Sequence, residues 1–465
     1  MEPAVLIDIG STFTKVTAVD WRTGQLLATS QAPTTASTDV MLGLDAALRQ
    51  LGIDTKRHLP RQMRACSSAA GGLRMVAVGL VPDLTVKAAN QAALGAGAKV
   101  LATFGYKLSS SEVQEIVDLN PDMVLLAGGT DGGDEQVLLH NARMLAACPL
   151  RAPLVVAGNK VISADAAAIL VVADKPVRLT ENVMPTLNRL NVEPVRQAIR
   201  ELFMERIIEG KGLRRIADLV SSSIVPTPMA VMTAAELLAA GADEQPGLGE
   251  LMVLDVGGAT TDVHSIARGA PTRSGMIQRG LPEPYAKRTV EGDLGVRWNA
   301  INIVERLPEM AGGGDPDVRD RAARLTKAVD FIPDDATSAQ FDVQLAHDAV
   351  ILAVGRHVGQ LETIYTPDGP MAILHGKDLS DLQVVIGTGG VLRYGLDAGR
   401  VMAGALYDQA EPSVLRPRNP KLYVDADYIL ASAGLLAEVN PGAAVRLMLS
   451  SLQLCGHGSL STNQG

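Results

Sequence analysis

The chain has 465 residues and a net charge of −9, from 42 basic and 51 acidic side chains. This length is too great for a single hydrophobic core, so two or more domains are expected. The acidic balance argues against nucleic acid or an anionic membrane as a general partner, and an aromatic content of 3% argues against base-stacking surfaces.

Cysteine usage and the N-terminal sequence favour a cytoplasmic protein. The three cysteines, Cys66, Cys148 and Cys455, are too few for a disulfide framework and lack the spacing of a zinc site. The chain starts with an apolar strand instead of a basic-then-apolar leader, and no apolar run reaches the ~18–20 residues of a membrane span. We therefore expect a protein of the reducing cytoplasm without a membrane partner.

The first segment predicts a β-hairpin followed by a helix. Residues 5–19 read as a strand, a turn and a second strand, Asp20–Gly24 form the next turn, and the chain returns over Gln25–Ser30. Residues 38–51 carry an apolar stripe that starts at Asp39, which is the pattern of a helix.

Residues 58–185 change character and predict an inserted α/β domain. An apolar strand at 123–127 runs into the glycine-rich turn Gly128–Gly133, a helical stretch follows, and residues 153–157 form a second apolar strand. This rhythm of strand, helix and strand predicts a parallel sheet. The glycine-rich turn could bind an anion, although a tight loop is the favoured interpretation.

The rest of the chain predicts further helices, one more buried strand and a flexible end. The expected helical regions span 194–212, 233–241 and 425–451, the last interrupted at Asn440–Gly442, with a strand at 383–387 and a linker at 409–421. Residues after Leu454 are small and polar, so we expect a flexible tail.

The most informative feature is a pair of similar hairpins far apart in the chain, at residues 5–16 and 252–263. Each reads as an apolar strand, an aspartate at its end, a turn with glycine, and then threonines. Glycine lets backbone N–H groups approach an anion, threonine hydroxyls add donors, and aspartate can hold hydrated Mg²⁺. Two such hairpins predict a duplicated clamp around the phosphates of a nucleotide.

These two hairpins, followed by the turn Gly387–Gly390, resemble in order and spacing the actin/Hsp70/sugar-kinase ATPase superfamily. The resemblance implies an α/β fold of two duplicated, RNase H-like lobes that bind ATP and Mg²⁺, with Pro226–Val231 and Ser432–Glu438 in the connectors between the lobes. It implies that Asp8 and Asp255 are the catalytic residues and hold Mg²⁺, orienting the ion and the attacking water. For each aspartate the alternative is turn capping, which the matched contexts make the weaker explanation.

The same resemblance implies which residues bind the nucleotide. They are Gly10, Ser11, Thr12, Thr14 and Lys15 in the first hairpin, Gly257, Gly258, Thr260, Thr261 and Asp262 in the second, and Gly387, Gly389 and Gly390 against adenosine. At least one of the threonines is expected to be only a strand residue. In a regular strand Lys15 lies on the face opposite Thr14, so a solvated lysine at the strand edge is an open alternative.

Several segments in the middle of the chain resemble one family more specifically, the glutamate mutase accessory family, called GlmL or MutL and unrelated to the mismatch-repair protein of that name. They are Cys66–Leu80, Gly128–Gly133, Ala157–Lys160, Glu181–Pro185 and Thr289–Gly295, and the resemblance covers about residues 4–452. It implies an ATP-dependent reactivating chaperone that serves an adenosylcobalamin-dependent mutase, either glutamate mutase or a related aminomutase, and releases damaged cobalamin.

The resemblance also implies a division of the chain. The first lobe is expected at 1–57 and 186–248, the inserted α/β domain at 58–185, the second lobe at 249–427, connector helices at 428–452 and the flexible tail at 453–465. The chaperone branch of the superfamily has a glutamate where this chain has Val225, so turnover is expected to be slow or triggered by a partner, with Glu236 as a weak substitute.

Other functions stay open on the sequence alone. A small-molecule kinase shares both hairpins but needs a general-base aspartate, and none is found beyond the hairpin residues. A hydantoinase-like ATP-dependent enzyme shares the first hairpin but not the inserted domain. A dehydratase activator needs cysteines for an iron–sulfur cluster, and this chain lacks their pattern.

Overall fold

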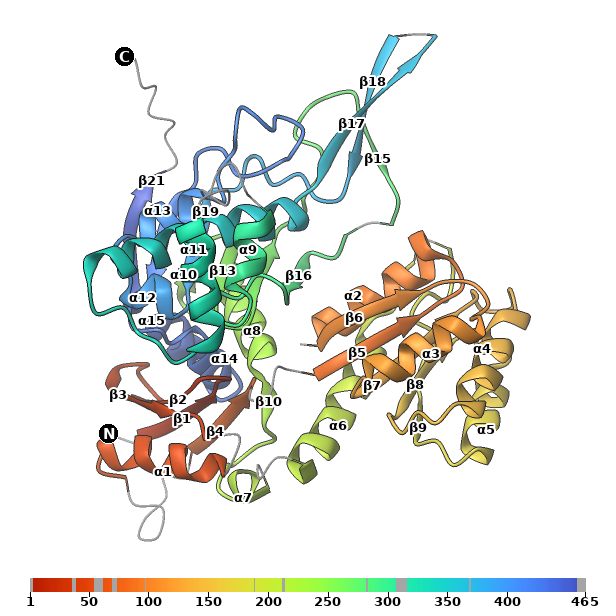
Figure 1. Ribbon diagram of the computed structural model, residues 1–465, viewed down its shortest axis with the longest axis horizontal. Coiled ribbons are helices and arrows are strands. Elements are labelled where there is room, and N and C mark those ends of the chain that lie inside the picture. The colour runs from red at the N-terminus through yellow and green to blue at the C-terminus, as the bar shows by residue number, and fades with distance from the viewer. Residues whose placement is uncertain are drawn as a thin grey trace.

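The computed structural model describes residues 3–35, 39–53, 62–68, 73–96, 98–187, 189–210, 214–281, 283–306, 316–367 and 369–457. Three larger β-sheets with helices packed on them make up most of this part of the chain (Figure 1). The fold is therefore α/β, as predicted. Among the described residues, no helix is both long and apolar enough to pass through a bilayer.

The first sheet contains the first hairpin. Its strand order is β3-β2-β1-β4-β10, in which β1, β2 and β3 form an antiparallel meander and β4 runs parallel to β1. Helix α1 covers the face that carries Val5 and Ile7, and Asp39 caps it as predicted by accepting a hydrogen bond from Met41 N. The elements are β1 Pro3–Ile9, β2 Phe13–Asp20, β3 Leu26–Pro33, α1 Val40–Gln50, β4 Gln62–Ser67 and β10 Val225–Pro226.

The second sheet repeats this topology. Its order is β16-β14-β13-β19-β20-β21, in which β13, β14 and β16 form an antiparallel meander and β19 runs parallel to β13. The hairpin β13–β14 thus occupies the place that β1–β2 has in the first sheet. The strands are β13 Leu251–Val256, β14 Thr261–Ile266, β16 Ala286–Glu291, β19 Val384–Thr388, β20 Lys421–Asp425 and β21 Leu452–His457.

The third sheet is the parallel one predicted for the middle of the chain. Its order is β6-β5-β7-β8-β9, and every neighbouring pair is parallel. The strands are β5 Leu73–Val78, β6 Ala98–Phe104, β7 Met123–Gly128, β8 Leu154–Gly158 and β9 Val177–Leu179.

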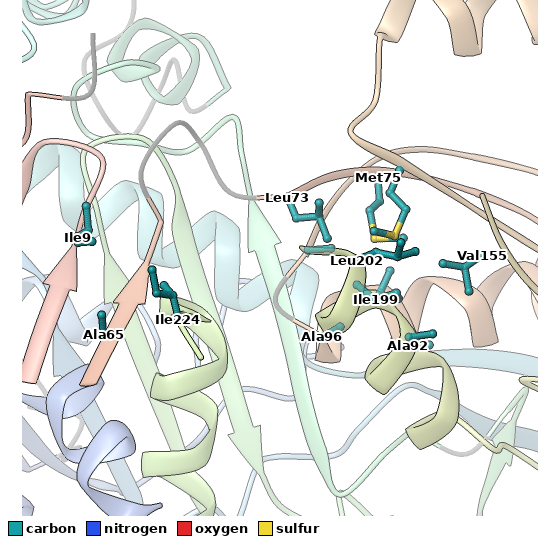
Figure 2. Packing of buried hydrophobic residues seen from close by; sticks show 14 of the residues in the cluster. Ile9, Ala65, Leu73, Met75, Ala92, Ala96, Val155, Ile199, Leu202 and Ile224 are labelled. Carbon is teal, nitrogen blue, oxygen red and sulfur yellow. The ribbon is translucent and has the colours of Figure 1, made fainter. Parts of the chain in front are cut away.

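Helices cover both faces of this third sheet. Helices α3, α4 and α5 pack on one face, and α2 and α6 pack on the other. Figure 2 shows Ile199 and Leu202 of α6 among Met75, Ala92 and Ala96. The helices are α2 Lys87–Gly95, preceded by a π-helical turn at Pro82–Val86, α3 Ser110–Leu119, α4 Gln136–Ala147, α5 Ser163–Val172 and α6 Glu193–Gly210, followed by the short α7 Arg214–Ala217.

A layer of three helices lies between the first and second sheets. Their apolar side chains form one buried cluster that includes Leu6 of β1 and Val253 of β13. Helices α8 and α14 cross so closely that a Cβ added to Gly434 would lie 1.9 Å from the Ala230 carbonyl oxygen. The helices are α8 Thr227–Ala240, α14 Leu430–Ala437 and α15 Pro441–Ser451.

The other face of the second sheet is covered by five helices. They are α9 Ala300–Arg306, α10 Pro316–Lys327, α11 Ala336–His357, α12 Gly390–Tyr394 and α13 Ala398–Ala403. A small sheet β15-β18-β17 and a two-stranded ribbon complete the described elements, with β15 Met276–Arg279, β17 Gln360–Thr366, β18 Gly369–His375, β11 Gly241–Ala242 and β12 Gln245–Pro246.

Two expectations are corrected by these elements. Helix α8 starts at Thr227 and not at residue 233, because Pro228 fits the first turn of a helix, where no N–H partner is needed. The expected flexible tail at 453–465 is wrong for residues 453–457, which lie in β21 and pair with β20. Residues 458–465 lie outside the described residues. The domain boundaries stay a prediction.

Candidate functional site

The two hairpins have the same local geometry. In the first, Gly10 N donates to Phe13 O at 3.0 Å, and in the second, Gly257 N donates to Thr260 O at 2.9 Å. The strand-end aspartate therefore has a fixed cross-strand neighbour in each sheet, and side chains of such pairs point to the same face. Asp8 pairs with Lys15, whereas Asp255 pairs with Asp262. The same backbone geometry therefore places Lys15 in the first hairpin where the second hairpin has Asp262.

The Asp8 carboxylate is surrounded by donors. Lys15 Nζ lies 2.9 Å from Oδ2, and the Thr227 hydroxyl donates to Oδ1 at 2.8 Å. The Cys66 thiol also points at Oδ1, at 3.5 Å, and burial raises the thiol pKa well above its ordinary value, so the sulfur keeps its proton. Asp8 is 5% exposed, and these contacts compensate the burial of its charge.

Lys15 also stacks on Tyr428, with Nζ 3.6 Å from the ring centroid. Burial by itself lowers the pKa of Lys15, but Asp8 and Tyr428 outweigh it and raise that pKa above its ordinary value. Burial raises the pKa of the Tyr428 phenol to about 12, so it is protonated at neutral pH. Tyr428 has a left-handed backbone, with φ of 57°, between β20 and α14.

Asp255 lies in a different electrostatic environment. Burial raises the pKa of Asp255 to about 7, and the negative charges of Asp262 and Asp8 add to the rise, while Lys15 and Arg288 oppose it. A Cβ added to Gly258 of the second hairpin would lie 3.9 Å from Thr12 Oγ1 of the first, so the two hairpins face each other.

Asp262 is held by an arginine from the neighbouring strand. Arg288 of β16 donates from Nε and Nη2 to Asp262 Oδ1 at 2.9 and 2.6 Å, and Thr260 Oγ1 donates to Oδ2 at 2.9 Å. The remaining terminal nitrogen of Arg288 donates to the carbonyl oxygens of Leu94 and Ala98, both at 3.1 Å. A single arginine therefore connects the second hairpin to the third sheet.

Two of the threonines expected at the phosphates point elsewhere. Thr14 is fully buried on the α1 side of the first sheet, where its hydroxyl bonds Thr34 at 2.9 Å. Thr261 is also fully buried, and its hydroxyl donates to Leu294 O at 2.7 Å. Lys15 lies on the face opposite Thr14, as expected for a regular strand. This is the face of Asp8, because Lys15 and Asp8 are a cross-strand pair. Gly10, Ser11, Thr12, Gly258 and Thr260 lie at the partly exposed turns.

The turn Gly387–Gly390 lies beside the second hairpin. Strand β19 pairs with β13 so that Thr388 is opposite Asp255, and a Cβ on Gly389 would lie 2.3 Å from Val256 O. Gly390 begins α12 next to open space. Gly387 has a different surrounding, because a Cβ there would meet Met402 and Leu392 of the covering helices, at 2.8 and 3.0 Å.

Several residues of this site were missed by sequence reasoning. Thr227, Tyr428 and Arg288 lie outside both hairpins, so the hairpin motifs do not reveal them. Val225 pairs with Cys66 through β10, and the residue that reaches Asp8 from this connector is Thr227. The suggested substitute, Glu236, is exposed, and the charges nearest to it are Arg196, Glu193 and Arg200.

The donors present fit a Mg²⁺ ion that binds together with a nucleotide. Among the described residues, no group of three or more His, Cys, Asp or Glu side chains could hold a metal by itself. Mg²⁺ in nucleotide sites uses one or two carboxylates and completes its shell with phosphate and water. Burial raises the pKa of Asp255 first and the neighbouring negative charges of Asp262 and Asp8 add to the rise, and a bound cation would relieve this repulsion.

Comparison with solved structures gives only distant matches. A glycerol dehydratase reactivase has 11% identity and a TM-score of 0.36, with 94% of this chain and 99% of that chain covered. Component A of the (R)-2-hydroxyglutaryl-CoA dehydratase of Acidaminococcus fermentans has 9% identity and a TM-score of 0.30, with 97% and 99% covered. At TM-scores below 0.5, neither likeness carries an argument.

Comparison at the level of sequence is decisive. A family model described as MutL protein matches residues 4–452. Protein MutL of Clostridium tetanomorphum is 46% identical over 455 residues, which are 96% of this chain and 98% of that protein. The chain therefore belongs to the MutL family, the glutamate mutase accessory family that the sequence motifs predicted.

Proposed function

We propose that the protein is an ATP-dependent reactivating chaperone for an adenosylcobalamin-dependent mutase, glutamate mutase or a related aminomutase. It would use binding and hydrolysis of ATP to release damaged cobalamin from that enzyme. The observation that carries the ATPase part is the pair of matching hairpins, which face each other with Asp8 and Asp255 at equivalent strand ends. The family membership supports the accessory role.

The charges of the two hairpins suggest different roles for the two aspartates. Asp8 is held by Lys15 and Thr227, which fixes its position. Burial and the negative charges of Asp262 and Asp8 raise the pKa of Asp255 to about 7 in the free protein, so this carboxyl would release a proton on binding Mg·ATP. Asp8 and Asp255 would hold a hydrated Mg²⁺, which would neutralise phosphate charge. The N–H groups of Gly10 and Gly257 already close their own turns, so donors to phosphate would come from later turn residues such as Ser11 and Gly258.

The arrangement of the sheets suggests how a nucleotide could move the molecule. We infer that the first and second sheets are the cores of two lobes, joined by the helix layer that contains α8, α14 and α15. The expected ranges, 1–57 with 186–248 and 249–427, would then be extended by β4 and β21, which belong to these sheets. ATP held by both hairpins favours the closed arrangement, and its hydrolysis removes that preference. The inserted domain, whose sheet starts at β5, would act as lever or partner surface.

A phosphate balance tests this function. The purified protein is incubated with Mg·ATP, either with a cyanocobalamin-blocked mutase or with cell-extract metabolites. We expect free phosphate to rise with the blocked mutase while mutase activity returns. Phosphate that appears on a small molecule instead would mean a kinase, and phosphate release without recovery of the mutase would contradict the reactivating role.

Variants test the site assignment in the same assay. We expect Asp8→Asn and Asp255→Asn each to lower ATP turnover by about 10²–10³-fold, the usual cost of removing one group that stabilises the charge of the reacting centre. Asp165→Asn, at an exposed position of α5, is the matched control and should turn over ATP at the normal rate. Unchanged Mg·ATP affinity and turnover in both site variants would contradict the assignment.

A further inference from the structure

Helix α5 lies at the outer edge of the third sheet (Figure 1). One side of this helix is buried against α4, β8 and β9. The other side is exposed, and its residues have the spacing i, i+4, i+7 and i+8 that places them on one helix face: Ala164, Ala168, Val171 and Val172. Val161, which is also exposed, comes three residues before Ala164. These five residues are called the α5 face below.

The α5 face is apolar, whereas the outer face of a helix in water is normally polar. Val172 is 89% exposed, and Val171 and Val161 are exposed as well. Helix α3 packs on the same side of the third sheet, and its exposed positions are polar: Ser111, Gln114, Glu115 and Asp118. The one charged residue of α5, Asp165, lies in the first turn, where the helix dipole favours a negative charge. An exposed apolar face of this kind indicates a surface that another molecule covers.

Opposite charges stand at the two ends of the α5 face. Lys160 comes directly before it and is 73% exposed, with Nζ 3.8 Å from Asp131, at the limit of an ion pair. Asp174 follows the end of the helix and is exposed. The cation next to it, Lys175, is turned inward, because its Nζ donates to two backbone carbonyls at 2.6 Å. The α5 face therefore has a positive and a negative end.

The order of these residues is symmetric about the middle of α5. If two copies of the helix meet in antiparallel orientation, opposite charges, two valines and two alanines face each other: Lys160 and Asp174, Val161 and Val172, Ala164 and Ala168. Two-fold symmetry makes each of these pairs twice. The small alanines in the middle let the helix axes approach closely, and the valines pack beside them. A parallel pair would bring like charges together at both ends, which is unfavourable.

We propose that the α5 face binds the α5 face of a second copy of this chain in an antiparallel, two-fold pair. The self-complementary order of charges and apolar side chains selects this partner. Helix α5 has 10 residues and is about 15 Å long, so the contact is small. Interfaces that bury less than ~1,200 Å² belong to weak and transient complexes. The dimer therefore forms at high protein concentration and separates on dilution.

Sedimentation velocity on the full chain, without nucleotide or mutase, tests this dimer. From about 5 to 500 µM, the weak range that a contact of this size implies, the mass should move from one chain towards two. Val172→Asp should weaken dimerisation by about tenfold or more, because it places a charge inside an apolar contact. Leu42→Asp, at an exposed apolar position of α1, is the matched control and should dimerise normally. A chain that stays monomeric throughout, or a dimer that Val172→Asp leaves intact, would overturn the proposal.

Exchange of the two end charges tests the antiparallel arrangement. Lys160→Asp or Asp174→Lys alone places like charges opposite each other, so each should weaken the dimer several-fold. The double variant brings opposite charges together again and should restore the dimer. Restoration identifies a second copy as the partner, because only a second copy carries both exchanges. A double variant that dimerises no better than the single variants would overturn the proposal.

Two further measurements complete the test. Thermal unfolding checks that each variant folds, which matters for Asp174→Lys because Asp174 has a left-handed backbone with φ of 57°. Co-sedimentation with the blocked mutase shows whether the α5 face serves the enzyme instead. A monomeric chain whose binding to the mutase is lost in Val172→Asp would assign the face to the mutase and overturn the proposal. Because the dimer assay contains neither ATP nor mutase, its result is independent of the function proposed above.

Discussion

At the scale of single residues, the site is a duplicated hairpin whose two copies carry opposite charges beside the strand-end aspartate. The cross-strand neighbour of the strand-end aspartate is Lys15 in the first copy and Asp262 in the second. A cation beside Asp8 stabilises its charge, whereas a second carboxylate beside Asp255 disfavours ionisation and adds to the effect of burial. Two aspartates in matching backbones thereby have neighbours of opposite charge.

This difference predicts a pH dependence. Asp255 would hold Mg²⁺ only when ionised, so kcat/KM for Mg·ATP should fall as pH decreases through about 7, the pKa that burial and neighbouring charges give this carboxyl in the free protein. Asp262→Asn removes one of the charges that raise this pKa, so the acid limb of the pH–rate profile should move to lower pH. The position of the limb is the readout, because the variant can also change the absolute rate.

Lys15 provides the opposite control for this experiment. Lys15→Met removes a cation that lowers the pKa of Asp255, so the limb should move to higher pH. If the acid limb of the pH–rate profile stayed at the same pH in both variants, another group would control the rate.

At the scale of elements, the helix layer between the first and second sheets depends on close backbone contact. Gly434 of α14 lies so near Ala230 of α8 that a methyl group would have to push two backbones apart. We expect Gly434→Ala to lower the free energy of unfolding by about 1–3 kcal/mol, the usual effect of overpacking, as measured by urea denaturation.

Gly355→Ala in α11 is the matched control for that variant. The nearest atom to an added Cβ there is Arg416 Nη2, a side-chain atom and not backbone, at 3.1 Å. Because alanine favours a helix over glycine by up to ~1 kcal/mol, this variant should be neutral or stabilising. Equal losses in the two variants would argue against a special contact between α8 and α14.

Arg288 is the element-scale link between the second hairpin and the third sheet. Arg288→Met leaves Asp262 as a buried charge without its partner, which costs on the order of 3–5 kcal/mol. We also expect faster hydrogen exchange at the end of α2 and the start of β6, since Leu94 and Ala98 lose their donor.

An exposed ion pair serves as the comparison for Arg288. Arg215→Met breaks the surface pair with Asp39, which should change stability by less than about 1 kcal/mol. If Arg288→Met lowered the free energy of unfolding as little as this control does, the bonds of Arg288 would not contribute to stability.

At the scale of the whole molecule, buried histidines make folding sensitive to acid. His264 of β14 is fully buried and neither ring nitrogen has a partner among the described residues. Burial lowers its pKa to about 3, and Arg288 adds to the effect. Its folded pKa is therefore below the unfolded value of ~6.5, so the unfolded chain takes up a proton first and stability is lost as pH falls below ~6.5.

His264→Leu should remove this contribution. Between pH 6.5 and 4, we expect the free energy of unfolding of the variant to depend on pH less steeply than that of the natural chain, by ~1.4 kcal/mol per pH unit. His375→Gln, at an exposed position, controls for the loss of a histidine. An unchanged slope in His264→Leu would show that this residue is charged or hydrated in the folded state.

The sequence by itself determined the features that depend on neighbouring residues. The helix start at Asp39, the parallel strands of the middle segment and both aspartate hairpins follow from local patterns of apolar residues, caps and glycines. Family membership was also visible in the motifs, because such segments are short and contiguous. The flexible tail was wrong for residues 453–457, since their pairing with β20 is a contact between segments about thirty residues apart.

Only the tertiary structure decided which side chains meet. Strand register, and not spacing, places Lys15 beside Asp8 and turns Thr14 away. Thr227 and Tyr428 reach the site from connectors more than two hundred residues from the first hairpin, and Arg288 reaches it from β16. The rise in the pKa of Asp255 depends partly on charges from both sheets, so its full size requires that the two hairpins face each other. Local secondary structure depends on residues that are adjacent in the sequence, whereas the electrostatics of the site depend on residues that folding brings together from distant segments.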